Sequence, residues 1–151
     1  MRNLVESFAE LPAIIRRPLW RWWHRYLLKK VPARDVSVLN YGYAELDETP
    51  SHNGEGPDPR DERYGENLYY QTVVNIGLDG KEVLEVGCGR GGGAKHLVRK
   101  YSLKRYVASD LSPDTTDYNN GMNEIPSLEF AVADAAELPF EDSAFDILVN
   151  V

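Results

Sequence analysis

The stretch VLEVGCGRGGG, residues 83–93, decides the fold of this 151-residue chain. Its first four residues are a short apolar run, which predicts a β-strand over 83–86. Apolar side chains at helical spacing then predict a helix over 92–100. The glycines between them lack a Cβ, so the backbone can turn sharply and pass close to a ligand. Free N–H groups at the start of a helix would face that ligand, so the stretch predicts a binding site where the strand turns into the helix.

The chain that follows repeats the strand-and-helix pattern. Apolar runs predict strands over 106–109, 128–132 and 145–151, and the last is typical of a parallel strand buried on both faces. Ser112 and Pro113 indicate a helix start, because a serine can cap it and a proline fits its first turn. The residues after them are poor helix formers, so we expect that helix to be short or loose. Strands that alternate with helices predict an α/β fold with a Rossmann-like parallel sheet.

The composition before residue 83 predicts a division into three parts: a helical cap or lid over 1–48, a flexible loop over 49–67, and a ligand-binding part over 68–151. A helix is expected over 66–76, where apolar side chains again recur on one side.

Within residues 16–30, basic side chains recur at every fourth position, which places them on one face of a helix. This face carries Arg17, Arg21, Arg25 and Lys29, and another face carries Leu19, Trp23, Tyr26 and Leu27, flanked by Trp20 and Trp22. Such a helix can make peripheral contact with a membrane. Its aromatic face can instead pack on the domain as a lid. The sequence leaves both interpretations open.

The charge of the chain is unevenly distributed. The net charge is −7, which argues against nucleic acid as a partner. Residues 1–35 hold eight Lys/Arg against three Asp/Glu, a balance of +5, whereas the remainder holds nine against twenty-one, a balance of −12. The two parts are therefore expected to have different roles.

Several classes of protein are disfavoured by what the sequence lacks. The single cysteine, Cys88, excludes an internal disulfide. No stretch reaches the roughly 18–20 apolar residues of a membrane span, and the first residues lack the apolar core of a signal peptide; a cytoplasmic location is expected. His24, His52 and His96 are scattered without metal-ligand spacing, so no metal is expected.

Three acidic residues help to define the ligand. Gly87, Gly89 and Gly92 fit the pattern G-x-G-x-x-G, so a nicotinamide or flavin dinucleotide is one candidate. Glu85 would crowd a negatively charged pyrophosphate, but it suits a ligand that carries an ammonium and a sulfonium group. Asp110, at the end of the second strand, is placed to accept hydrogen bonds from a ribose diol. Asp134, at the end of the third, is placed to accept from an adenine amino group.

Taken together, LEVGCGRGGG, ASDLS and ADAAELPFEDSAFDILVNV, within residues 83–151, resemble the class I S-adenosylmethionine-dependent methyltransferases. The segments RWWHRYLL, NYGYAELDE and ENLYYQTVVNIGLDGKEVLEVGCGRGGGAKHL, which extend over nearly the whole chain, further resemble the phthiotriolone/rifamycin-type small-molecule O-methyltransferases. This resemblance implies S-adenosylmethionine as cofactor and O-methylation of a small hydrophobic, lipid- or polyketide-like acceptor. A sterol-type C-methyltransferase and a non-catalytic S-adenosylmethionine-binding fragment are the alternatives.

The resemblance also implies which residues bind the cofactor, and it leaves the catalytic residues unassigned. When the roles of the family's residues are carried over by position, the methionine side of the cofactor would contact the backbone loop of Gly87, Cys88, Gly89 and Gly91. Glu85 would lie near the amino group of the cofactor, and Asn150 beside the methionine moiety. The ribose would be held by Asp110, with Leu111 next to it, and adenine by Asp134 and Ala135. Tyr41, Tyr43, Tyr69 and Tyr70 either line the mouth of this site or belong to an aromatic core.

A complete enzyme of this class has seven strands in the order 3-2-1-4-5-7-6. The present chain is expected to supply the first four, in the order 3-2-1-4, and to be truncated after strand four. In the resembling family the acceptor contacts come from later segments. Strand four would then be a bare apolar edge, so self-association through this edge is expected.

Overall fold

The computed structural model describes residues 11–30, 37–45 and 62–151. The chain divides into two compact units, residues 1–35 and residues 36–151. The first contains helix α2 (Ala13–Lys30), as the basic and aromatic pattern predicts. None of the helices in these ranges is long and apolar enough to cross a bilayer. Within the same ranges, no group of three or more His, Cys, Asp and Glu side chains could hold a metal ion.

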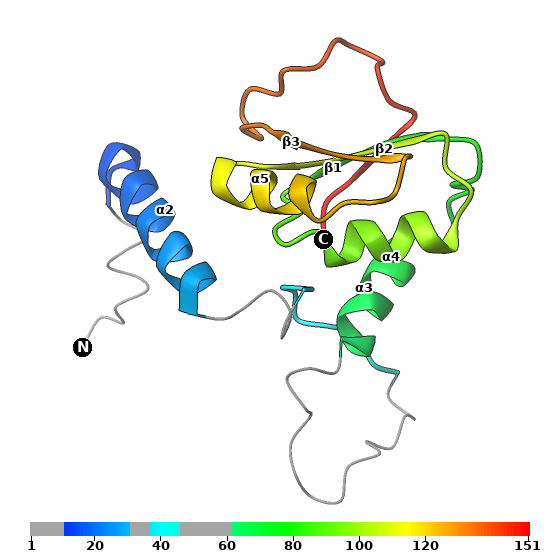
Figure 1. The fold of residues 1–151 in the computed structure, drawn as a ribbon, viewed down its shortest axis with the longest axis horizontal. Helices are drawn as coiled ribbons and strands as arrows, with labels where there is room; N and C mark the ends of the chain where they lie inside the picture. Colours follow the sequence, from blue (N-terminus) through cyan, green and yellow to red (C-terminus); the bar gives the residue numbers. More distant parts are fainter. Residues whose placement is uncertain (1–10, 31–36, 46–61) are drawn as a thin grey trace, which may run out of the picture. The chain divides into compact units, whose positions relative to one another are not determined.

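The second unit is a four-stranded parallel sheet with helices packed on one side (Figure 1). Its strands are β1 (Glu82–Val86), β2 (Arg105–Asp110), β3 (Leu128–Val132) and β4 (Ile147–Val149), in the order β3-β2-β1-β4, which confirms the predicted order. Its helices are α3 (Arg63–Val73), α4 (Gly92–Lys100) and α5 (Pro113–Gly121). The chain between β3 and β4 arches over the opposite side of the sheet. Because all four strands are parallel, their carboxyl ends meet at one edge.

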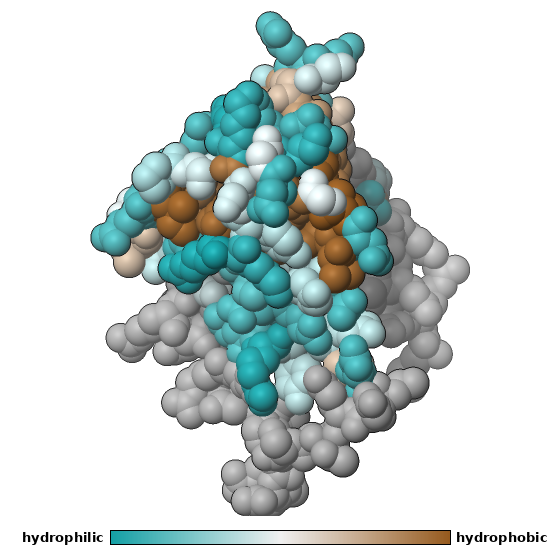
Figure 2. Space-filling model, turned by 90° about the vertical axis from the view of Figure 1, so that its right-hand side faces the viewer, coloured by the Kyte–Doolittle hydropathy of each residue, from teal (hydrophilic) through white to brown (hydrophobic). Residues whose placement is uncertain are grey.

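The hydrophobic core of this unit lies between the sheet and its helices. Side chains from β1, β2, α3 and α4 meet there, and the largest that are fully buried include Tyr106, Leu97, Val73 and Val83. Apolar atoms also reach the surface: on the side shown in Figure 2 they form separate areas among polar groups. The packing of this core holds the four strands in place, and with them the edge at which their carboxyl ends meet.

Two predicted boundaries are wrong. Helix α3 begins at Arg63 and ends at Val73, whereas the pattern predicted 66–76; the part of the predicted loop that precedes residue 62 lies outside the described residues. Strand β4 covers three residues instead of the predicted 145–151. The Phe145 ring packs edge-on against Phe140, with 5.2 Å between ring centroids, so this part of the apolar run serves packing instead of strand pairing.

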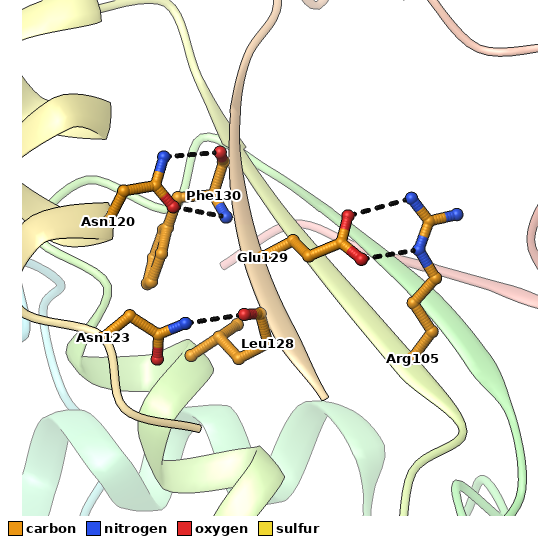
Figure 3. Close-up of polar contacts among 6 residues, drawn as sticks. All are labelled: Arg105, Asn120, Asn123, Leu128, Glu129 and Phe130. Atoms are coloured by element: carbon orange, nitrogen blue, oxygen red, sulfur yellow. Dashed lines mark hydrogen bonds and ion pairs between the residues drawn. The ribbon is translucent and has the colours of Figure 1, made fainter. Parts of the chain in front are cut away.

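Helix α5 is regular over nine residues although its sequence forms helices poorly. Figure 3 shows what compensates: Asn120 donates through Nδ2 to the carbonyl of Phe130 at 3.0 Å and accepts from the Phe130 N–H at 3.3 Å. Asn123 donates to the carbonyl of Leu128 at 2.6 Å. Strand β3 is an edge of the sheet, so these amides satisfy backbone groups that would otherwise be open to another strand. Asn120, which weakens the helix locally, thereby attaches it to the sheet, and Asn123 attaches the turn that follows the helix.

Candidate functional site

The glycine-rich turn after β1 is tied to the end of β2. The N–H groups of Gly87 and Cys88 both donate to the carbonyl of Ser109, at 2.8 and 2.9 Å. The next N–H, of Gly89, donates to Oδ2 of Asp110 at 3.0 Å. Gly87 and Gly89 have φ angles of 85° and 52°, which L side chains rarely adopt. The turn is therefore held against the carboxylate that the sequence singles out.

The first two glycines of the turn border open space. A Cβ added at Gly89 would find no atom of the described residues within 4 Å, and one at Gly87 would find only Nδ2 of Asn150, at 3.6 Å. Asn150 itself donates to the carbonyl of Val86 at 2.6 Å. The backbone is thus accessible to a ligand at these two positions, next to the Asp110 carboxylate.

The last three glycines are packed against protein instead. A Cβ at Gly91 would lie 2.6 Å from the Phe130 ring. One at Gly92 would overlap Ser37, whose carbonyl accepts the Gly92 N–H at 3.2 Å, and one at Gly93 would overlap the ring of Tyr69. The pattern G-x-G-x-x-G assigns Gly92 to a ligand-binding motif. In the structure, the absence of a Cβ at Gly92 instead lets the segment over 37–45 pack close to the helix. The first two glycines of the run therefore leave the backbone accessible to a ligand, and the last three allow close packing.

Asp110 is oriented by backbone groups on both sides. Its Oδ1 accepts the N–H of Ser112 at 2.9 Å while Oδ2 accepts that of Gly89. Ser112 is the capping residue of α5, as predicted, and accepts the N–H of Thr115. Each carboxylate oxygen can accept a further hydrogen bond, so Asp110 is positioned without being saturated. Leu111, beside it, is exposed.

The remaining predicted residues lie at the same edge of the sheet. The N–H of Ala133 donates to the carbonyl of Asp110 at 3.0 Å, which brings the end of β3 beside the end of β2. Asp134 follows, and its Oδ1 accepts the N–H of Ala136 at 2.9 Å. Ala135 is exposed. The structure thus brings the predicted ribose and adenine residues to neighbouring strand ends.

Glu85 is directed into the core. Its side chain is fully buried, and its two carboxylate oxygens accept from the hydroxyls of Tyr69, at 2.6 Å, and Tyr106, at 3.0 Å. Burial raises the pKa of Glu85 to about 7, although the two tyrosine hydrogen bonds act in the opposite direction. Its predicted contact with a ligand amino group stays a prediction. In the structure, the two hydrogen bonds of Glu85 link α3, β1 and β2.

A pH dependence of stability follows from this buried acid. The pKa of Glu85 is raised from 4.5 to about 7 in the folded protein, so the folded state binds its proton more tightly than the unfolded state. The stabilisation is complete below pH 4.5 and is lost as the pH rises through about 7. Glu85→Gln should remove this dependence, and the free energy of unfolding of the wild type relative to the variant should fall by about 3 kcal/mol across that window.

Urea denaturation of both proteins at a series of pH values measures this difference. Other titrating groups are common to the two proteins and cancel. A difference in unfolding free energy that does not vary with pH would show that Glu85 is ionised to the same extent in both states.

Cys88 has no features of a nucleophile. Its side chain is buried, and burial raises the pKa of the thiol, with the nearby carboxylates of Glu85 and Asp110 adding to the effect. The thiol is therefore protonated at neutral pH and donates weakly to the carbonyl of Gly89 at 3.7 Å. Its contribution to the site is the backbone of a tight turn.

Sequence reasoning missed the partners that fix this site. Asn119 is fully buried and donates to the carbonyl of Gly89 at 2.9 Å, yet its residue type indicated only a weak helix. The sequence did not distinguish whether Tyr69 lines the mouth of the site or belongs to the core; in the structure it is a core residue. Tyr106 was noted only as part of a strand. No local pattern signals these contacts, since each joins residues sixteen or more positions apart.

Comparison with known proteins assigns residues 83–151 to a family model described as a methyltransferase domain. This range begins at β1 and contains the glycine turn, Asp110 and Asp134. It coincides with the part of the chain in which the sequence motifs occur.

Two curated relatives are similar over a longer range. The fatty-acid O-methyltransferase of Mycolicibacterium smegmatis is 38% identical over 128 residues, which cover 85% of this chain and 46% of the relative. The phthiotriol/phenolphthiotriol dimycocerosates methyltransferase of Mycobacterium leprae is 34% identical over 133 residues, which cover 88% and 48%. The chain thus spans about half the length of the curated relatives it matches.

Among solved structures, the cyclase SpnF superposes with a TM-score of 0.50 at 25% sequence identity, over 57% of this chain and 33% of that chain. The likeness supports the Rossmann-like fold. Because that protein is named as a cyclase, the fold by itself does not establish the reaction.

Proposed function

We propose that residues 83–151, which match a family model described as a methyltransferase domain, are the cofactor-binding part of a class I S-adenosylmethionine-dependent methyltransferase. We propose further that the carboxyl edge of their sheet binds S-adenosylmethionine and that the protein methylates a hydrophobic small molecule. The observation that carries this proposal is the open pair of glycines, Gly87 and Gly89, beside an oriented carboxylate, Asp110. A cofactor with a ribose and a flexible amino-acid arm fits this combination, since the first needs a paired acceptor and the second needs accessible backbone.

Each part of the cofactor has a residue suited to hold it. Asp110 would accept the two ribose hydroxyls, and the exposed Leu111 beside it would contact the sugar and the base. Asp134 and the N–H of Ala135 would bind the edge of adenine. The backbone of Gly87 to Gly89 would lie along the methionine arm, near Asn150. The N–H and carboxylate groups of this edge are donors and acceptors of the kinds that such a ligand needs.

When bound, S-adenosylmethionine supplies a methyl group that is already activated on a sulfonium. What remains for the protein is to orient the cofactor and the acceptor and to exclude water. Asp110 accepts hydrogen bonds from the N–H groups of Gly89 and Ser112, and Asn119 donates one to the carbonyl of Gly89. These bonds would hold the loop in one position for this purpose. An oxygen acceptor would also need a base, and no residue of this chain is assigned that role.

A hydrophobic acceptor is supported by two observations. Apolar side chains at the carboxyl edge are exposed, among them Leu111, which follows β2, and Val132, which ends β3. The names of the relatives refer to lipids, a fatty acid and the phthiotriol dimycocerosates. We therefore propose a lipid-like acceptor methylated on oxygen, with carbon methylation of a sterol-like acceptor and cofactor binding without turnover as the alternatives.

Transfer of labelled methyl groups distinguishes these outcomes. The protein is incubated with methyl-labelled S-adenosylmethionine and, separately, with a long-chain fatty acid, a long-chain secondary alcohol or a sterol. Label extracted into organic solvent and released by alkali would indicate a methyl ester; alkali-stable label would indicate an ether or a carbon–methyl bond. Binding of the cofactor with no label in any extract would leave a binding protein and contradict the methyltransferase proposal.

A further inference from the structure

Helix α2 presents an aromatic stripe to solvent. The stripe consists of Ile15, Leu19, Trp22 and Tyr26, which follow the spacing i, i+4, i+7 and i+11, together with the adjoining Trp23. All five side chains are exposed, Trp22 to 60%. The rings of Trp22, Trp23 and Tyr26 contact one another, with centroids 5.8 to 6.4 Å apart. Large apolar side chains that lie exposed next to one another are typical of an interaction site.

The charge of the helix indicates what the stripe contacts. Residues 13–30 hold six basic residues and no acidic one: Arg16, Arg17, Arg21, Arg25, Lys29 and Lys30. Residues 36–151 have the opposite charge, with nine Lys/Arg against twenty-one Asp/Glu. A negatively charged surface therefore attracts the helix and repels the rest of the chain. Tryptophan and tyrosine favour the boundary between water and lipid, since their rings are apolar and carry a polar group.

We propose that α2 lies in the interface of an anionic lipid bilayer, with the aromatic stripe inserted between the lipids and the basic side chains at the headgroups. The helix combines the two requirements for this mode of binding, an apolar face and an excess of positive charge. The repulsion between the membrane and residues 36–151 would keep the second unit in the water phase. The inference does not depend on methyl transfer, because it concerns the first unit alone.

Tryptophan fluorescence tests this without an added probe, because the three tryptophans of the chain, at positions 20, 22 and 23, all lie in α2. The full chain is titrated with vesicles of phosphatidylcholine alone or mixed with phosphatidylglycerol. Mixed vesicles should shift the emission to shorter wavelength and should bind at least about tenfold more tightly than neutral ones at low salt. This preference should decrease as salt is added.

A matched pair of variants locates the contact. Trp22→Ser together with Trp23→Ser should abolish binding to the mixed vesicles in a sedimentation assay. Met122→Ser, in the second unit, removes an apolar side chain that is also 60% exposed and should leave binding unchanged. Circular dichroism of both variants checks that they are folded.

Two results would overturn the proposal. One is emission that is already at short wavelength without vesicles and does not change when they are added, which would mean that the stripe packs on the chain itself as a lid. The other is the absence of binding, or equal binding to neutral and anionic vesicles.

Discussion

Replacing Gly93 with alanine is expected to destabilise the second unit by about 3 kcal/mol. The added Cβ would overlap the ring of Tyr69, which is buried and cannot move aside, because its hydroxyl donates to Glu85 at 2.6 Å. Either α3 must separate from α4 or the hydrogen bond to Glu85 must break. Urea denaturation, followed by far-ultraviolet circular dichroism, measures the loss as a lower midpoint.

Two further variants isolate the cause. Gly121→Ala, at the end of α5, adds a Cβ with no described atom within 4 Å and should change the stability by less than about 0.5 kcal/mol. Combining Gly93→Ala with Tyr69→Ala should destabilise by less than the sum of the two single changes, since the second removes the ring that the first overlaps. If Gly93→Ala were as stable as Gly121→Ala, α3 would not pack on the glycine run.

Asp110→Ala is expected to weaken the binding of S-adenosylhomocysteine by about 100-fold. The proposed complex has two hydrogen bonds from ribose hydroxyls to this carboxylate, and bonds to a charged group contribute about 1.5–3 kcal/mol each. The change also removes the acceptor of the Gly89 N–H and so loosens the turn that faces the ligand. Isothermal titration of the variant and the wild type measures the ratio of dissociation constants.

The control for this prediction is Asp117→Ala, which removes an exposed carboxylate from the adjoining helix α5. It has the same effect on net charge and should bind as tightly as the wild type. Asp110→Asn should be intermediate, because its amide oxygen can still accept from Gly89 but carries no charge. If the alanine variants at positions 110 and 117 bound S-adenosylhomocysteine equally tightly, Asp110 would not be part of the binding site.

The strands and their order could be predicted because their signals are local. Each signal lies within the few residues that form the element: the apolar run over 83–86 for the strand, the glycines after it for the turn, and Ser112-Pro113 for the helix start. Parallel strands joined by helices then allow few arrangements. The final apolar run was extended too far, to 145–151, because a continuous run does not distinguish residues in the ladder from those packed beside it.

The inner supports of the site could not be predicted because they depend on contacts between distant residues. Glu85 was interpreted from its distance to Gly87 along the chain, which does not reveal that Tyr69 and Tyr106 enclose it. Asn119 and Asn120 were interpreted by helix propensity, which tertiary hydrogen bonds override here. Residue type and spacing indicated which side chains lie near the carboxyl edge of the sheet, but not which of them the fold turns inward.

The most direct test of the proposed cofactor site is isothermal titration of the unmodified chain with S-adenosylhomocysteine and, separately, with NADH. The open turn at Gly87 and Gly89, beside Asp110, predicts binding of the first ligand at one site and no heat of binding from the second. Binding of NADH in preference, or of neither ligand, would contradict the assignment of this edge as an S-adenosylmethionine site.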